Sequence, residues 1–247
     1  MARTSTPRAR KPARAQAFTR KLLAWWARAA RDLPWRKTRD PYRVLVSEFM
    51  LQQTQVSRVA EYYPRFLERF PDLETLARAR PRAVREAWDG LGYYARASNL
   101  HSLAKRVTGR SVAGDGVPTL PDDPAELMKL PGIGPYTAGA VASFAYEKPV
   151  PAVDTNVARV ITRVFFGNSR QRLSGNRQRI IWSLAASLVP KNGKRAWKFN
   201  QAVMELGALV CVARKPKCPE CPVRPVCRTG NTRRTDAAGE NRLRKSR

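Results

Sequence analysis

Apolar residues recur three and four positions apart along most of the chain, which is the spacing of amphipathic helices. No segment alternates apolar and polar residues as a half-buried strand would. Proline and glycine mark the breaks between the periodic segments. The pattern predicts an all-α fold, with helices over 17–31, 42–60, 72–79, 81–88, 95–107, 124–129, 136–146, 154–165, 177–188 and 197–210.

Composition narrows the class of protein. Of the 247 residues 43% are apolar, which is enough to bury a sizeable core, so a wholly disordered chain is excluded. No apolar run approaches the ~18 residues of a membrane span, and no charged-then-apolar leader opens the chain. We therefore expect no membrane partner and a reducing, aqueous compartment.

The charge of the chain points to a polyanionic partner. Lys and Arg number 47 against 19 Asp and Glu, a formal net charge of +28. The stretch 155–204 holds no acidic residue, and we expect its basic residues to face phosphate rather than only solvent. They include Arg159, Arg163, Arg172, Arg179, Lys194 and Lys198. The ends, 1–16 and 229–247, are expected to be disordered basic tails, with a transit peptide as the alternative for the first.

The four cysteines lie close together near the end of the chain. They form the pattern Cys211-x6-Cys218-x2-Cys221-x5-Cys227. Four thiolates at this spacing can surround one metal centre, whereas disulfide frameworks normally spread through small secreted domains. The unequal gaps fit poorly with paired zinc knuckles, so a [4Fe-4S] cluster is favoured over zinc. Two disulfides or four free thiols remain as alternatives.

The segment 130–137 has the pattern of a helix-hairpin-helix turn. A helix stops, two glycines bracket one apolar residue, and a new helix begins with small residues. Glycines let a backbone pass close to a phosphate while the amides of the following helix point at it. An ordinary tight turn between helices is the alternative. The expected DNA-contacting residues are Gly132, Ile133, Gly134, Tyr136 and Thr137.

Two carboxylates occur where acid chemistry can be expected. Glu48 is embedded in the apolar run 44–51, where an ionised carboxylate is costly, so its pKa should rise until it holds a proton near neutral pH. A neighbouring arginine that neutralises it is the alternative. Asp154 precedes a basic helix, and as a helix N-cap it would stay ionised; a capping role alone is the alternative. A protonated acid next to an ionised one suits the release of a base from a sugar.

Several motifs together resemble one enzyme family. They are LPWR at 33–36, SEFMLQQTQV at 47–56, GLGYYARASNLH at 90–101, LPGIGPYTAGAV at 130–141, VDTNVARV at 153–160 and FNQAVMELGALVC at 199–211. From about residue 18 to 228 the chain resembles adenine DNA glycosylases of the MutY type. These are helix-hairpin-helix glycosylases with an iron-sulfur cluster. The resemblance implies a base-excision-repair enzyme that removes adenine opposite 8-oxoguanine or guanine from double-stranded DNA.

The resemblance also implies an architecture. We expect two helical lobes with a cleft between them, a six-helix barrel lobe at 36–147 with the hairpin, and a [4Fe-4S] lobe at 17–35 plus 148–228. A monomer is expected, located with the nucleoid in the cytoplasm of a bacterium, or in the nucleus or an organelle of a eukaryote. The family usually carries a further domain that reads 8-oxoguanine, but only about twenty residues follow Cys227 here. We therefore expect weaker discrimination of the opposite base.

Individual roles are implied by the same resemblance. Glu48 matches the general acid that protonates adenine, and Asp154 matches the carboxylate that stabilises the sugar cation. Tyr136 and Asn156 match orienting residues. The residues that match the adenine pocket are Trp35, Arg36 and Glu205. Two residues, Gln53 and Tyr93, match side chains that enter the duplex. The cluster ligands are matched by Cys211, Cys218, Cys221 and Cys227.

The residue at position 136 separates two reaction types. Related endonuclease III enzymes carry a lysine there, whose amine attacks the sugar, whereas a tyrosine cannot form a Schiff base. We therefore expect a monofunctional glycosylase. Asp-Thr-Asn at 154–156 departs from the Asp-Gly-Asn common in the family. The alternatives are a thymine or uracil mismatch glycosylase of the same superfamily and a non-catalytic iron-sulfur protein that binds DNA damage.

Overall fold

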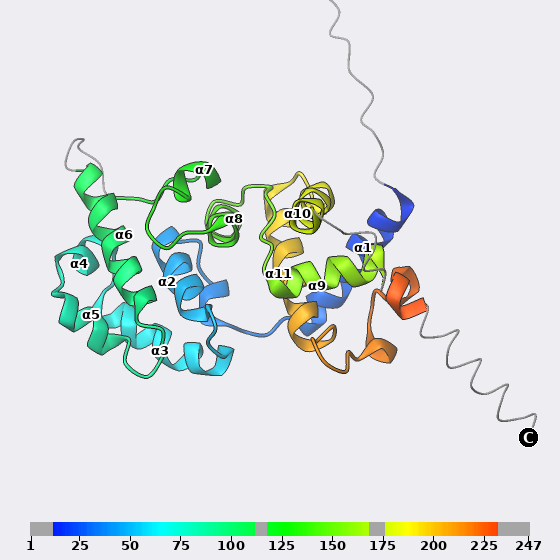
Figure 1. Ribbon diagram of the computed structural model, residues 1–247, viewed down its shortest axis with the longest axis horizontal. Helices are drawn as coiled ribbons and strands as arrows, with labels where there is room; N and C mark the ends of the chain where they lie inside the picture. Colours follow the sequence, from blue (N-terminus) through cyan, green and yellow to red (C-terminus); the bar gives the residue numbers. More distant parts are fainter. Residues whose placement is uncertain (1–11, 112–117, 168–175, 232–247) are drawn as a thin grey trace, which may run out of the picture. The chain divides into compact units, whose positions relative to one another are not determined.

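The computed structural model describes residues 12–111, 118–167 and 176–231. These residues form helices joined by turns, with no strand in the described ranges, so the all-α prediction is confirmed (Figure 1). None of the described helices is both long and apolar enough to pass through a membrane. The tails expected at 1–16 and 229–247 lie mostly outside the described residues, but the first helix, α1 (Ala13–Ala29), begins four residues before the expected tail boundary.

The chain divides into two compact units. One is Arg31–Asp154 with Val189–Asn200, called here the hairpin unit; the other is called the cysteine unit and comprises the described parts of Met1–Ala30, Thr155–Leu188 and Gln201–Arg247. Helix α11 (Gly193–Leu209) contributes residues to both. The hairpin unit holds the 3-10 turn η1 (Pro34–Arg36) and helices α2 (Pro41–Leu51), α3 (Val56–Arg69), α4 (Leu73–Arg78), α5 (Pro81–Ala87), α6 (Ala95–Ser111), α7 (Pro124–Leu127) and α8 (Pro135–Phe144).

The cysteine unit combines helices with several short helical turns. Its helices are α1, α9 (Thr155–Ile161), the π-helical turn η2 (Thr162–Phe166) and α10 (Arg177–Leu188), followed by the 3-10 turns η4 (Cys218–Glu220) and η5 (Arg224–Val226). Phe18 of α1 is fully buried and packs edge-to-face on Phe165, with ring centroids 5.3 Å apart. The segment after α11 contains little regular structure of its own.

Helices α2 and α8 form the centre of the hairpin unit and lie side by side (Figure 1). Asp40 caps α2, since its side chain accepts a hydrogen bond from the Arg43 amide at 2.8 Å, and Pro41 follows at the first helical position. Val44 to Met50 are all buried. Helix α8 packs closely because its residues are small: a Cβ on Gly139 would lie 2.2 Å from the Pro151 carbonyl oxygen. The segment that leads to Asp154 can therefore pass directly against α8.

The single helix expected over 42–60 is wrong. The structure has two helices, α2 and α3, separated at 52–55, and Gln53 adopts a left-handed backbone with φ of 59°. Periodicity could not reveal the break, because Phe49, Val56 and Tyr63 lie seven positions apart, a spacing that keeps apolar residues on one face of a continuous helix. The helix expected over 154–165 is also not uniform, since α9 gives way to the π-helical turn.

Candidate active site and cysteine cluster

Glu48 is buried in the middle of the hairpin unit and is paired with Tyr136. The side chain of Glu48 is 3% exposed, and the Tyr136 hydroxyl donates a hydrogen bond to its Oε2 at 2.7 Å. The two residues meet because α2 carries Glu48 on the side packed against α8, and Tyr136 lies in the first turn of α8. A carboxyl group and a phenol 88 positions apart in sequence thus form one polar pair within an apolar environment.

The environment raises the pKa of Glu48 from 4.5 to about 7. Burial is the largest cause, and the negative charge of Asp154 adds to it. The hydrogen bond from Tyr136 and the positive charge of Arg36 lower the pKa, but they do not outweigh burial. Arg36 is the arginine that the neighbouring-arginine alternative requires, and its charge leaves the pKa of Glu48 raised. Near neutral pH a large fraction of Glu48 carries a proton.

Asp154 belongs to the same electrostatic site. It directly precedes α9 and is half-buried. Its charge raises the pKa of both Glu48 and Tyr136. The pKa of Tyr136 lies well above its ordinary value, first through burial and then through the charges of Glu48 and Asp154, so the phenol stays neutral and acts as a donor. The hairpin unit thus holds a protonatable acid, a second carboxylate and a neutral hydroxyl within interaction range.

The residues expected to bind adenine are divided between the units. Trp35 in η1 is 8% exposed and packs edge-to-face on Tyr63, with ring centroids 5.7 Å apart. Arg36 donates a hydrogen bond to the Arg31 carbonyl at 3.0 Å. Glu205 lies in the cysteine unit, where it is 1% exposed on α11. Their roles as pocket residues remain predictions.

Asn156 lies in the first turn of α9 in the cysteine unit. Its Oδ1 accepts a hydrogen bond from Arg159 at 2.6 Å. A Cβ on Gly207 would lie 2.6 Å from the Cβ of Asn156, so α11 can approach α9 this closely only because Gly207 has no side chain. Packing and a charged donor therefore both fix the orientation of the Asn156 amide.

The turn before α8 has the geometry that the hairpin motif predicts. Gly132 adopts a left-handed φ of 75°, and a Cβ there would lie 2.8 Å from the Cβ of Asn99. Gly134 is exposed at the N-cap of α8, with no atom within 4 Å of the position a Cβ would take. The side chains of Ile133 and Thr137 are buried, so a contact from either with DNA would use the backbone. The first-turn amides of α8 have no acceptor within the helix itself.

Gln53 lies in the loop between α2 and α3, and Tyr93 lies in the loop between α5 and α6; both loops belong to the hairpin unit. Gln53 is exposed, and Tyr93, with 61% exposure, is one of two large apolar side chains described as exposed. Both adopt left-handed backbone conformations, with φ of 59° and 46°. Residues other than glycine and asparagine seldom do so without a compensating interaction.

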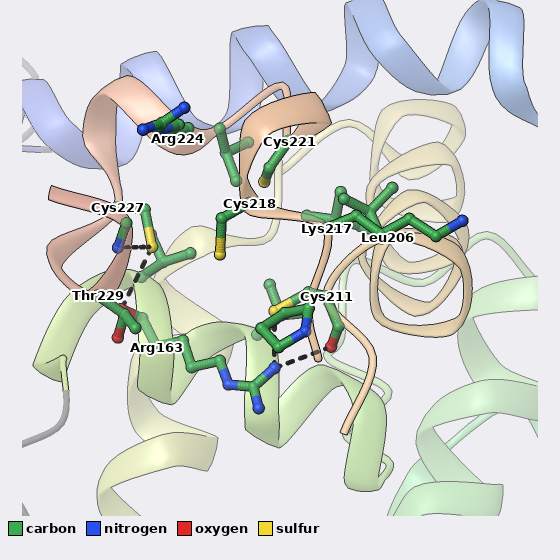
Figure 2. A pocket seen from close by; sticks show the side chains of 15 residues that line it. Arg163, Leu206, Cys211, Lys217, Cys218, Cys221, Arg224, Cys227 and Thr229 are labelled. Atoms are coloured by element: carbon green, nitrogen blue, oxygen red, sulfur yellow. Dashed lines mark hydrogen bonds between the residues drawn. The ribbon is translucent and has the colours of Figure 1, made fainter. Parts of the chain in front are cut away.

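The four cysteines surround one cavity of the cysteine unit (Figure 2). None of the four forms a disulfide, so the alternative of two disulfides does not hold. The cavity is also lined by Val164 of η2, Leu206 of α11 and Val223. In Figure 2 the sulfur atoms of Cys211, Cys218 and Cys227 point toward the common space between their chain segments.

The chemistry of this cavity fits a thiolate-bound group. Arg163 donates a hydrogen bond to the Cys211 sulfur at 3.4 Å, and the Gly230 amide donates to the Cys227 sulfur at 3.3 Å. Burial raises the pKa of Cys227 and raises that of Cys221 to about 11, so thiolates here need a cationic partner.

Two kinds of metal centre use four thiolates. Among the residues described, no three His, Cys, Asp or Glu side chains are arranged to hold a metal ion. Zinc binds sulfur at about 2.3 Å, so all of its ligands crowd around a single centre. An iron-sulfur cluster uses the same four ligands, but its metal atoms are themselves spread out.

Comparison with known proteins places this architecture in a family. Residues 46–186 match the model of the HhH-GPD superfamily base excision DNA repair proteins. The match covers more than half of the chain and includes the acid, the hairpin and Asp154. The chain belongs to this superfamily.

Sequences of two adenine DNA glycosylases are similar to this chain along most of its length. It is 43% identical to an adenine DNA glycosylase of Rattus norvegicus and 46% identical to one of Mycolicibacterium smegmatis, over 86% and 82% of its length. It spans only 41% and 66% of those two relatives. The solved structure of a thermostable thymine-DNA glycosylase matches with 33% identity and a TM-score of 0.77, covering 89% of this chain and 97% of that one. The resemblance to adenine DNA glycosylases is confirmed.

Two arginines of this HhH-GPD protein contradict the expectation that they face phosphate. Arg159 donates to the carbonyls of Cys211 at 2.8 Å and Gly207 at 2.8 Å. Arg163 donates to the carbonyls of Val212 at 2.7 Å and Cys211 at 3.2 Å. They lie one helical turn apart and hold the end of α11, because the last carbonyls of a helix lack acceptor partners within it. Arg172, from the same basic stretch, lies outside the described residues.

Sequence reasoning also missed Arg96. It is 7% exposed and makes seven hydrogen bonds, all within the hairpin unit. An arginine in a helix of a basic chain is normally a surface residue, and only its place in the GLGYYAR segment distinguished it. Its partners lie in two segments about 40 positions apart, which periodicity cannot bring together.

Proposed function

We propose that the protein is a monofunctional DNA glycosylase that removes adenine mispaired with 8-oxoguanine or guanine from double-stranded DNA. The observation that carries the proposal is the buried Glu48, whose pKa of about 7 leaves it able to donate a proton beside the charge of Asp154. Breaking an N-glycosidic bond leaves electrons on the base and positive charge on the sugar. Those two charges need one protonated acid and one carboxylate.

In the proposed reaction the bond between the deoxyribose C1′ and the adenine nitrogen breaks, and both electrons leave with the base. Glu48 donates its proton to the departing adenine. The carboxylate of Asp154 stabilises the cationic sugar until the oxygen of water bonds to C1′. Glu48, now ionised, is the base that can take up the proton which that water releases. The products are free adenine and an abasic strand.

Tyr136 limits the enzyme to this hydrolysis. A lyase of the related type needs an amine that forms a Schiff base with the opened sugar. Tyr136 offers a neutral hydroxyl, which is already donated to Glu48. Its role is to orient the acid and to tune its pKa. We assign a similar orienting role to Asn156, and a substrate-binding role to Trp35, Arg36 and Glu205.

The proposed DNA contacts come from backbone and surface charge. The turn at Gly132 and Gly134 leaves an exposed approach to the first amides of α8, where a phosphate of either strand fits without base contacts. The formal net charge of +28 supplies sequence-independent affinity. Gln53 and Tyr93 then occupy the space that the extruded adenine leaves in the stack.

We also propose that Cys211, Cys218, Cys221 and Cys227 hold a [4Fe-4S] cluster. Such a cluster, when bound, would tie the end of α11 to the turns η4 and η5 through its iron–sulfur bonds. The four cysteines around one cavity, none of them in a disulfide, and the two N–H donors that face their sulfurs support this assignment.

A second substrate class has a specific observation in its favour. The solved structure of a thermostable thymine-DNA glycosylase matches this chain along 97% of its own length. Because of this match, thymine or uracil opposite guanine is the competing substrate for this chain. The higher identity to two adenine DNA glycosylases favours adenine.

A single-turnover assay decides between these substrates. The protein is mixed in excess with duplexes that carry adenine opposite 8-oxoguanine, adenine opposite guanine, thymine opposite guanine or uracil opposite guanine. Hot alkali then cleaves at abasic sites. We expect strand cleavage only after alkali, and fastest for the adenine duplexes. Faster loss of thymine or uracil would make the second class the correct one.

Glu48→Gln tests the acid directly. Glutamine keeps the size and can still accept the hydrogen bond from Tyr136, but it has no proton to give. We expect adenine release to fall by about 100-fold or more with unchanged duplex affinity. Glu61→Gln is the matched control, because Glu61 is an exposed residue of α3 paired with Arg65. Normal turnover by Glu48→Gln would exclude Glu48 as the acid.

A further inference from the structure

Arg96 closes the C-terminal end of α2. It lies in the first turn of α6, and its guanidinium donates to the carbonyls of Phe49 at 2.9 Å, Met50 at 2.8 Å and Gln52 at 2.6 Å. The last carbonyls of a helix have no partner within it, and a positive charge there is favourable. Arg96 thus ends α2 immediately before Gln53.

The same guanidinium binds a second loop. It donates to the carbonyls of Leu91 and Gly92, each at 3.0 Å, and its Nε donates to the Tyr93 carbonyl at 3.4 Å. A further bond reaches the Thr54 hydroxyl at 3.1 Å. One buried cation therefore connects the segments on both sides of Gln53 with the loop that carries Tyr93.

The two residues next to these contacts are both strained and exposed. Gln53 and Tyr93 are two of the four described non-glycine residues with a positive φ. An exposed aromatic ring can stack on a nucleic-acid base, and an amide can hydrogen-bond its edge. The strained backbone at both positions persists only where surrounding contacts determine it, and Arg96 supplies those contacts.

We propose that Arg96 is a positioning residue that holds Gln53 and Tyr93 as one rigid wedge, ready to fill the DNA stack when the target nucleotide leaves it. This inference rests on the proposed glycosylase function. A wedge ordered before binding does not lose side-chain and loop entropy on entering the duplex, so more of its stacking energy can offset unpairing of the base. Lysine cannot replace Arg96, because an ammonium has three donors and cannot span both loops.

The test compares paired and unpaired adenine. One duplex carries adenine opposite 8-oxoguanine; the other carries the same adenine opposite a stable abasic-site analogue, where little unpairing is required. Arg96→Met and Arg96→Lys are measured under single turnover on both. A fluorescent 2-aminopurine beside the target adenine reports base extrusion. Melting curves establish that each variant is folded.

We expect both variants to release paired adenine about 100-fold more slowly, with a matching loss in the extrusion signal. On the unpaired duplex they should approach the wild-type rate, because the wedge is then not needed. If Arg96→Met does not fold, Arg96→Lys alone decides. Arg58→Met is the matched control: Arg58 also binds this loop, at the Gly90 carbonyl, but from an exposed position, so both rates should stay unchanged.

An equal loss on both duplexes would overturn the inference, since Arg96 would then support the fold or the chemistry rather than the wedge. Unchanged rates on both would also overturn it. A wild-type protein that releases adenine from neither duplex would refute the proposed function instead. In that case the 2-aminopurine signal still tests Arg96, because extrusion is measured without bond cleavage.

Discussion

At the scale of single residues, position in the fold separates two chemically similar carboxylates. Glu48 lies 3% exposed inside α2, while Asp154 is half-buried at the start of α9. Burial raises the pKa of the first to about 7, and the charge of the second contributes to that rise. The same side-chain chemistry thus serves as a proton donor at one position and as a stabilising charge at the other.

The raised pKa of Glu48 implies a cost to folding. Its carboxyl has a pKa of 4.5 when unfolded and about 7 when folded, so the unfolded state holds fewer protons between these values and stability falls as pH rises through that window. We predict that Glu48→Gln stabilises the protein by about 3 kcal/mol above pH 7. Below pH 4.5 the difference from wild type should largely vanish.

Urea unfolding at pH 8 and at pH 4.5 measures this difference. Glu61→Gln serves again as the control and should change the free energy of unfolding by less than about 1 kcal/mol at either pH, because its ion pair with Arg65 is exposed. A Glu48→Gln variant that is less stable than wild type at pH 8 would mean that Glu48 is ionised without cost in the folded state.

Tyr136 offers a second prediction at the residue scale. Its hydrogen bond lowers the pKa of Glu48, so Tyr136→Phe should raise that pKa further. Because the acid must be protonated, adenine release by the wild type should decline above about pH 7. In Tyr136→Phe this decline should move upward by about one pH unit. Single-turnover rates from pH 5.5 to 9 give both profiles, and a shift toward lower pH would contradict the assigned hydrogen bond.

At the scale of elements, the hairpin turn separates a glycine required for folding from one available for binding. Gly132 has a φ of 75° and no space for a Cβ beside Asn99, so Gly132→Ala should cost about 2 kcal/mol or more. Gly134 has ordinary dihedrals and open space, so Gly134→Ala should cost less than about 1 kcal/mol. We predict that Gly134→Ala weakens binding to an undamaged duplex while its melting temperature stays close to wild type.

The two variants act as controls for each other. Fluorescence anisotropy with a labelled duplex, at one fixed salt concentration, measures affinity beside the melting temperatures. If Gly134→Ala binds DNA as tightly as wild type, the phosphate does not approach at this turn. If Gly132→Ala is fully stable, its left-handed conformation is not required.

Elements with strong local signals could be predicted from the sequence, and those that depend on distant partners could not. The hairpin turn and the raised pKa of Glu48 could be predicted from local sequence, because the glycines of the turn and the apolar run around Glu48 can be read from neighbouring positions. At the division between α2 and α3 the carbonyls that end α2 accept hydrogen bonds from Arg96, which lies more than 40 positions away in sequence. The sequence charge predicted that Arg159 and Arg163 face phosphate, but both bind backbone carbonyls of the chain itself.

At the scale of the whole molecule, the two units depend on different forces. The hairpin unit has an extensive apolar core around α2, α6 and α8. In the cysteine unit the described segment that follows α11 has two three-residue turns, η4 and η5, a short helical turn at 228–231, and four thiols around one cavity. Such a short segment buries little apolar surface, so bonds to metal would supply much of its stability.

Removing one thiolate should therefore affect the units unequally. We predict that Cys221→Ser lowers the iron and sulfide content and unfolds the segment 211–231, while Glu48 and Tyr136 keep their environment in the hairpin unit. Elemental analysis measures the metal, and hydrogen exchange read by mass spectrometry locates the loss of protection. Exchange should rise by about 100-fold or more in 211–231 and remain unchanged in α2 and α8.

A matched variant separates loss of the ligand from loss of packing. Val223 lines the same cavity and is buried, so Val223→Ala removes apolar contacts but no ligand. We expect it to keep its iron and to lose about 1–2 kcal/mol of stability. Zinc in place of iron and sulfide in the purified wild type would exclude a [4Fe-4S] cluster. Full protection of 211–231 in Cys221→Ser would mean that the segment folds on packing alone, and metal would then have no structural role.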